Sequence, residues 1–198
     1  YLAKPVSGAL LETAVLSVLP RDLVHINKES TQAEIGKDVL IFEREQMIPV
    51  MITTDSVCDL PESLKEEFNI ATCPYYVCTD QGRFLDELEM KADEFVRHLA
   101  AGKAGYSQPP DVEDYEKFFA EKLTMAQNVI HITMAKHTSE GYYHAMEAAK
   151  SFSNITVLDS GHLSSSLGLA VLYAATMAEN HATKEDIIKT VESLRPRL

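Results

Sequence analysis

The stretch Ile48-Pro49-Val50-Met51-Ile52-Thr53-Thr54-Asp55-Ser56 decides the fold class of this chain of 198 residues. Its first part is rich in β-branched and apolar residues, which predicts a strand, and its end is polar. Asp59-Leu60-Pro61 then predicts a helix start, because Asp59 can cap the helix and Pro61 suits its first turn. A strand, a polar loop and a helix in this order predict the opening unit of an α/β domain.

Predicted strands and helices alternate along the rest of the chain. This alternation predicts an α/β fold with a mostly parallel sheet and helices on both of its faces. Phe84-Leu85-Asp86 is expected to return antiparallel as a hairpin arm after a turn at Asp80-Gln81-Gly82. The other strands are expected at 71–79, 128–133 and 155–158, and the helices at 91–101, 111–123, 139–151, 163–178 and 184–194.

Composition and charge argue against some classes of binding partner. Thirty acidic against eighteen basic side chains leave a formal charge of −12, which repels nucleic acid phosphates and anionic membrane surfaces. No apolar run reaches the ~20 residues that a membrane span needs. The three cysteines, Cys58, Cys73 and Cys78, lack a metal-type spacing and a dense disulfide framework. We therefore expect reduced thiols, no metal, no cofactor and a cytoplasmic protein.

Residues 1–48 differ from the α/β pattern and predict a helical appendage followed by a linker. Tyr1 to Leu19 predict one strand end and one amphipathic helix, and residues 25–48 predict a polar linker. The sequence begins with neither an initiator Met nor a signal-peptide profile, so we expect it to be part of a longer protein.

The motif Tyr1-Leu2-Ala3-Lys4-Pro5-Val6 with Leu10-Leu11-Glu12 resembles the carboxy-terminal end of a response-regulator receiver domain, over residues 1–24. The resemblance implies that Lys4 matches the lysine that contacts the phosphoryl group in that family. The phosphoacceptor aspartate is absent from the sequence, so phosphotransfer by this chain is not expected. The alternative is an amphipathic helix without a signalling role.

Polar residues gather where three predicted strands end. Ligands of parallel sheets bind beyond the carboxyl ends of the strands, so these residues are expected to converge on one crevice. Hydroxyls, an ammonium, an imidazole and helix N–H groups favour an anionic group there, such as a carboxylate, although each polar residue alone could be a helix cap. The residues are Thr54, Asp55 and Ser56; Lys136 and His137 within 133–139; and Asp159 and Ser160.

The stretch Gly105-Tyr106-Ser107-Gln108-Pro109-Pro110 adds a further hydroxyl. Its glycine and prolines argue against a helix or a central strand, so we predict an exposed, rigid loop that presents Ser107. The alternative is a plain connection in which Ser107 caps the next helix. A carboxylate site requires Ser107 and His137 to approach the same crevice.

The order of these motifs resembles the amino-terminal lobe of the DegV family over residues 49–198. The resemblance implies a two-lobed fatty-acid-binding protein that holds an acyl chain between its lobes and presents it to a partner fatty acid kinase. It also implies that the chain supplies no catalytic group and that the second lobe is absent from this sequence. The motifs are Thr54-Asp55-Ser56 with Asp59-Leu60-Pro61, Ser107-Gln108-Pro109, Gly141 with Tyr143, and 157–160 with Ser166-Leu167-Gly168.

By position, the resemblance implies a fatty acid carboxylate held by Ser107, Tyr106, Lys136 and His137. The family usually has Thr where this chain has Tyr106, and a Ser-Ser pair where it has Lys136-His137. A cation can pair with a carboxylate or can mark a different ligand. Without its second lobe, the chain is expected to bind the ligand weakly or to self-associate through an exposed apolar surface.

Two other functions compete with lipid carriage. Ser107 and His137 are residue types of a serine hydrolase, but the sequence lacks a Gly-x-Ser-x-Gly elbow and a third triad member. The second alternative is a ligand-sensing regulatory module of a two-component signalling protein, which would report an acidic or acyl metabolite to the receiver-like segment.

Overall fold

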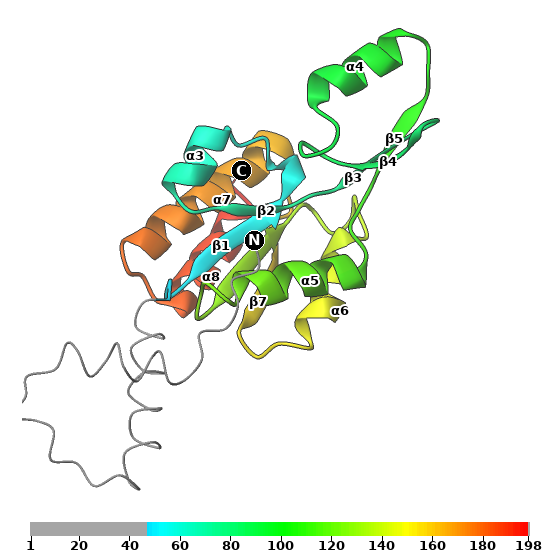
Figure 1. Cartoon of the computed structure of the whole chain (residues 1–198). Helices are drawn as coiled ribbons and strands as arrows, with labels where there is room; N and C mark the ends of the chain where they lie inside the picture. The colour runs from blue at the N-terminus through cyan, green and yellow to red at the C-terminus, as the bar shows by residue number, and fades with distance from the viewer. Residues whose placement is uncertain (1–46, 198) are drawn as a thin grey trace, which may run out of the picture. The chain divides into compact units, whose positions relative to one another are not determined.

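Four parallel strands form the main sheet of the computed structural model, which describes residues 47–197 (Figure 1). The strand order is β2 (Ala71–Cys73), β1 (Met51–Asp55), β6 (Val129–Thr133) and β7 (Ile155–Asp159). Every residue of β1 and β6 is buried, as expected for central strands that are covered on both faces. The predicted α/β class with a mostly parallel sheet is confirmed.

Two pairs of helices cover the two faces of this sheet (Figure 1). Ile52 belongs to one hydrophobic cluster and the adjacent Met51 to the other, because successive strand residues point to opposite faces. The first cluster includes Leu167 of α7 and the second includes Phe119 of α5. The pairs are α5 (Val112–Lys122) with α6 (Gly141–Ala149), and α7 (Ser164–Glu179) with α8 (Lys184–Leu194).

Gly168 lets α7 lie directly against the 3-10 turn Ser56–Cys58 that follows β1. A Cβ atom at this position would lie 2.5 Å from the carbonyl oxygen of Cys58. Overpacking of this kind costs about 1–3 kcal/mol, so Gly168→Ala is expected to lower the free energy of unfolding in urea by that amount. Ser165→Ala, at an exposed position of the same helix, is the control and should have little effect. Equal stability of both variants would mean that α7 shifts without cost.

A second, antiparallel sheet contains β3 (Tyr76–Thr79) between β4 (Gly82–Leu85) and β5 (Gly105–Gln108). The pairing of β3 with β4 confirms the predicted hairpin arm. The prediction of one strand over 71–79 is wrong, because β2 and β3 belong to different sheets. Pro74 has no N–H to offer a ladder, and the N–H of Tyr75 donates to Ser56 Oγ instead (3.1 Å).

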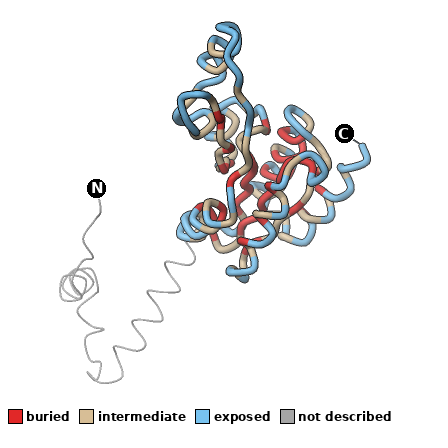
Figure 2. The backbone as a smooth tube through the Cα atoms, turned by 90° about the vertical axis from the view of Figure 1, so that its right-hand side faces the viewer, coloured by how far each residue is buried: buried red, intermediate tan, exposed pale blue. Residues whose placement is uncertain are grey.

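The prediction of a loop at Gly105–Pro110 is also wrong, because Gly105–Gln108 is strand β5 at an edge of the small sheet. An edge strand hydrogen-bonds to only one neighbour, here β3, so the prolines can follow immediately without breaking a ladder. The small sheet and α4 (Ala92–Ala100) stand to one side of the main sheet (Figure 1). Buried positions concentrate along the main sheet, and the region of α4 is mostly exposed (Figure 2).

The remaining helix, α3 (Glu62–Glu67), leads from the 3-10 turn to β2. Within residues 47–197, no helix is both long and apolar enough to cross a membrane. The receiver-like segment 1–24, its Lys4 and most of the predicted linker 25–48 lie outside the described residues.

Candidate functional site

A cavity of about 440 Å³ opens beyond the carboxyl end of β6. Ser107 of β5 and both Lys136 and His137 of the loop after β6 line it, so the structure brings these three predicted residues together. We call this cavity the Ser107 pocket. Its complete lining is Tyr75, Ser107, Pro109, Met134, Lys136, His137, Thr138, Ser139, Glu140 and Tyr143.

Tyr106 is not among the residues that line the Ser107 pocket. Its neighbour Ser107 lines the pocket, and successive side chains of a strand point to opposite faces. Tyr106 is 67% exposed. The structure therefore separates Tyr106 from the other three residues that the family resemblance assigned to a carboxylate.

The other polar residues at the strand ends hold the loops in place and do not line the Ser107 pocket. Thr54 Oγ1 donates to the carbonyl oxygen of Ile132 (2.7 Å), and Ser56 Oγ donates to Asp86 Oδ2 (2.6 Å). Ser160 Oγ accepts from the N–H of His162 (3.0 Å).

Asp55 is fully buried and anchors the start of the loop that carries Lys136. Its Oδ1 accepts a hydrogen bond from the Tyr115 hydroxyl (2.9 Å), and its Oδ2 accepts one from the N–H of Met134 (2.9 Å). Burial raises the pKa of Tyr115 well above its usual value, so this hydroxyl stays protonated and donates. His131 lies beside the carboxylate, with Nε2 3.3 Å from Asp55 Oδ1 but not aligned for a hydrogen bond.

Tyr75 and Ser139 form the inner wall of the Ser107 pocket, and sequence analysis did not select Tyr75. The Tyr75 hydroxyl lies 2.8 Å from Ser139 Oγ, which also accepts from the N–H of Gly141 (3.1 Å). Burial raises the pKa of Tyr75, so its hydroxyl keeps its proton, and the Ser139 hydroxyl carries a proton as any serine does. The bond between them uses one of these two protons, and the other is left for an acceptor in the pocket. The break in the strand pattern at Pro74 was the only sequence signal for Tyr75.

Lys136 is the lysine among the residues that line the Ser107 pocket. Its side chain is 43% exposed, and Nζ lies 4.0 Å from Asp159 Oδ2 and 5.8 Å from the ring centre of Tyr142. At 4.0 Å the ammonium forms an ion pair with Asp159 but no hydrogen bond, so its N–H donors have no hydrogen-bond partner within residues 47–197. The exposed carboxylate of Glu140 is also part of the lining.

Neither a hydrolase triad nor a metal site is formed by the described part of the chain. No hydrogen bond joins Ser107 to His137 within residues 47–197, and no group of three or more His, Cys, Asp or Glu side chains there could hold a metal ion. Cys58, Cys73 and Cys78 are buried and free. Burial raises the pKa of Cys58 and Cys73, which disfavours the reactive thiolate.

A comparison with known protein families shows to which family the domain belongs. Residues 49–198 match the family described as "Uncharacterised protein, DegV family". The chain belongs to the DegV family. A DegV domain-containing protein of Caldanaerobacter subterraneus is 31% identical over 154 residues, which are 77% of this DegV chain and 55% of the relative.

Two solved structures are similar in fold to this chain, and the description of each of these proteins names fatty acid binding. A DegV family protein from Thermus thermophilus, described by its fatty acid binding, has a TM-score of 0.70 and 27% identity, over 75% of this chain and 54% of its own. A Thermotoga maritima protein, described as revealing a fatty acid binding function, has a TM-score of 0.66 and 29% identity, over 74% and 55%. This DegV chain thus spans about half the length of these relatives.

The DegV resemblance of residues 49–198 is therefore confirmed. The receiver-like segment, the linker and Lys4 stay predictions, because the family match begins at residue 49 and the structure describes residues from 47 onward.

Proposed function

We propose that this DegV chain binds a fatty acid and holds its carboxylate in the Ser107 pocket. The observation that carries the proposal is the convergence of five donor side chains on one cavity from three separate segments of the chain. These side chains are Tyr75, Ser107, Lys136, His137 and Ser139.

The chemistry of these donors suits a carboxylate. The Lys136 ammonium can form a charge-assisted hydrogen bond, which is roughly twice as strong as a neutral one. Ser107 and the Tyr75–Ser139 pair each offer an O–H, and α6 begins at Gly141 beside Ser139, so that its positive dipole end lies near the pocket. The fatty acid binding described for the Thermus and Thermotoga relatives supports the same ligand class.

Apolar side chains continue from the pocket along α6 and offer a path for the acyl chain. Tyr143 lines the pocket and is 57% exposed, and Met146, three residues further along the helix, is 40% exposed. Residues three apart lie on the same face of a helix, so these two side chains form one apolar strip. We propose that the first part of the acyl chain packs on this strip.

On this proposal the DegV chain contributes binding and no catalytic group, and a partner fatty acid kinase would phosphorylate the bound carboxylate. Self-association of the lobe and a cytoplasmic location also stay predictions. The competing function, a ligand-sensing module of a two-component protein, depends on residues 1–24, and no observation favours it.

Binding of oleate to the purified chain, measured by isothermal titration calorimetry, tests the function. Oleate is expected to bind at least about tenfold more tightly than oleyl alcohol, because the alcohol cannot form the charge-assisted contacts. If neither compound binds, or if both bind equally, the carboxylate function is wrong. Native mass spectrometry of the purified protein should also detect a bound acyl chain.

Ser107→Ala is expected to lower the oleate affinity about fivefold to tenfold, because one hydrogen bond to a charged group is lost. Ser107 lies in an edge strand and is exposed, so the variant should keep the stability of the wild type. Ser165→Ala, on α7 and outside the pocket lining, is the matched control and should bind oleate like the wild type. An unchanged affinity of Ser107→Ala would leave Ser107 only a structural role in β5.

A further inference from the structure

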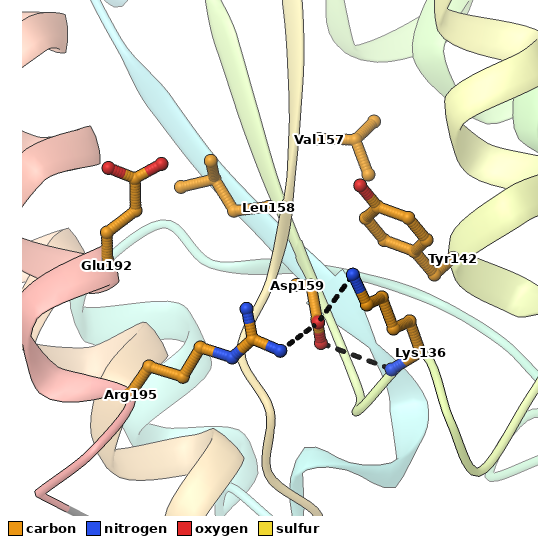
Figure 3. Close-up of a pocket in the computed structure, with 7 residues that line it drawn as sticks. All are labelled: Lys136, Tyr142, Val157, Leu158, Asp159, Glu192 and Arg195. Atoms are coloured by element: carbon orange, nitrogen blue, oxygen red, sulfur yellow. Dashed lines mark hydrogen bonds and ion pairs between the residues drawn. The ribbon is translucent and has the colours of Figure 1, made fainter.

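Lys136 also lines a second cavity, of about 310 Å³, which we call the Asp159 pocket (Figure 3). Asp159 lies there between Lys136, from the loop after β6, and Arg195, which follows α8. The side chain of Asp159 is only 6% exposed. The complete lining is Lys136, Tyr142, Val157, Leu158, Asp159, Glu192 and Arg195.

The two carboxylate oxygens of Asp159 are not equally satisfied. Oδ1 accepts hydrogen bonds from the N–H groups of Lys136 (3.1 Å) and Gly161 (2.9 Å). Oδ2 lies 2.7 Å from Arg195 Nη2, but the N–H does not point at it, so this buried oxygen has an ion-pair partner and no hydrogen bond within residues 47–197. Ionic attraction depends mainly on separation, so the guanidinium stabilises the Asp159 carboxylate at this distance. Oδ2 can therefore still accept a hydrogen bond.

The Lys136 ammonium is the nearest candidate for that hydrogen bond. Nζ is 4.0 Å from Oδ2, and a hydrogen-bonded ammonium would be about 2.7–2.9 Å away. A shift of about 1 Å would thus convert this ion pair into a hydrogen bond and fix the ammonium on Asp159. At present the positive charge of Arg195 offsets the negative charge of Asp159, which weakens its pull on Lys136.

Arg195 is held in this position by the loop after β7. Gly161 has a φ of +73°, and a Cβ atom there would lie 2.8 Å from Arg195 Nε, so the arginine side chain crosses the glycine at close range. The carbonyl oxygen of Arg195 lies 3.0 Å from Nε2 of His162 in the same loop. The fold therefore places the guanidinium beside Asp159 through two contacts that are independent of the ion pair.

We propose that Arg195 is a positioning residue, which neutralises Asp159 and so keeps Lys136 available to a carboxylate in the Ser107 pocket. This inference rests on the proposed function of that pocket. An unpaired charge on a nearly buried carboxylate is costly in free energy. Without Arg195, Asp159 would therefore pair more closely with the nearest remaining cation, Lys136. Arg195 then controls ligand binding although it does not line the Ser107 pocket.

Oleate binding by three variants of the full chain tests the role of Arg195. Arg195→Gln is expected to lower the oleate affinity about fivefold to tenfold, because Asp159 then captures Lys136. Arg195→Lys keeps the charge and should stay within about twofold of the wild type. The double variant Arg195→Gln/Asp159→Asn removes the competing carboxylate as well, and should recover the wild-type affinity to within about twofold. Arg197→Gln, two residues further on, is the control for loss of a positive charge.

The outcomes separate this inference from the proposed function. If the wild type binds oleate and Arg195→Gln binds it equally well, the positioning role is wrong and the carboxylate site stands. If Arg195→Gln binds weakly and the double variant does not recover, Arg195 acts through structure or direct contact, which also overturns the inference. If the wild type itself does not bind oleate, the proposed function is wrong. Urea denaturation of each variant identifies a loss of affinity that comes from unfolding.

Discussion

Replacing Asp55 by alanine is expected to lower the free energy of unfolding by about 3–5 kcal/mol. The carboxylate is fully buried and accepts hydrogen bonds from the Tyr115 hydroxyl and the N–H of Met134, with the His131 ring beside it. Without the acceptor, these buried donors have no partner, and each unsatisfied group costs about 1–3 kcal/mol. Urea denaturation followed by circular dichroism measures the loss. Because Met134 opens the loop that carries Lys136, oleate binding should fall together with stability.

Two further variants make this prediction specific. Asp55→Asn keeps one acceptor oxygen but turns an amide N–H₂ toward a donor, so its stability should lie between those of the wild type and Asp55→Ala. Asp93→Ala removes an exposed aspartate from the first turn of α4 and should leave the unfolding midpoint nearly unchanged. A loss for Asp55→Ala no larger than that of Asp93→Ala would show that water replaces the carboxylate without cost.

Lys136→Glu is expected to weaken oleate binding by at least about 100-fold, the largest binding effect of any single change proposed for this chain. The substitution replaces an ammonium by a carboxylate on a residue that lines the Ser107 pocket, where Glu140 already contributes one carboxylate. The ligand carboxylate would then meet two like charges. Titration calorimetry with oleate measures the effect, and binding of oleyl alcohol should change little because the alcohol carries no charge.

Lys150→Glu is the matched control for this charge reversal. Lys150 follows the opposite end of α6 from the pocket, and its side chain is 69% exposed. The two variants have the same net charge, and solvent and salt screen a distant surface charge, so Lys150→Glu should bind oleate within about twofold of the wild type. Equal losses in both variants would attribute the effect to net charge and would exclude Lys136 as a ligand contact.

The local sequence pattern predicted most of the secondary structure, because helix and strand formation depends largely on the spacing of apolar residues within a segment. The apolar run of β6 and the long apolar helix α7 appear at their predicted places, within a residue or two at each end. The predictions of secondary structure that are wrong concern segments whose conformation depends on contacts with a distant part of the chain. Gly105–Gln108 becomes a strand only because β3 offers it an edge, and the run 71–79 is divided because Tyr75 bonds to Ser56, which lies 19 positions away.

For the candidate site too, the sequence predicted some residues and missed others that depend on distant contacts. The polar strand ends predicted Lys136 and His137, and the Gly- and Pro-rich stretch 105–110 predicted Ser107. These three residues line one pocket, and the DegV pattern over residues 49–198 supplied the ligand hypothesis. Tyr75 was missed because its hydroxyl partner Ser139 lies 64 positions away. Tyr106 was predicted by its position in the family resemblance, and position in the sequence does not reveal that its side chain lies on the opposite face of β5 from that of Ser107.

The sequence alone predicted the α/β class, a mostly parallel main sheet and the set of polar residues where its strands end, because hydrophobic period and helix-start residues are local properties. Only the tertiary structure shows what each of those residues contacts and therefore what it does. Asp55 bonds Tyr115 across 60 positions, and Asp159 meets Arg195 after α7 and α8 return it to the carboxyl edge of the sheet. The role of a side chain depends on which residues it contacts, and packing between distant segments determines those contacts.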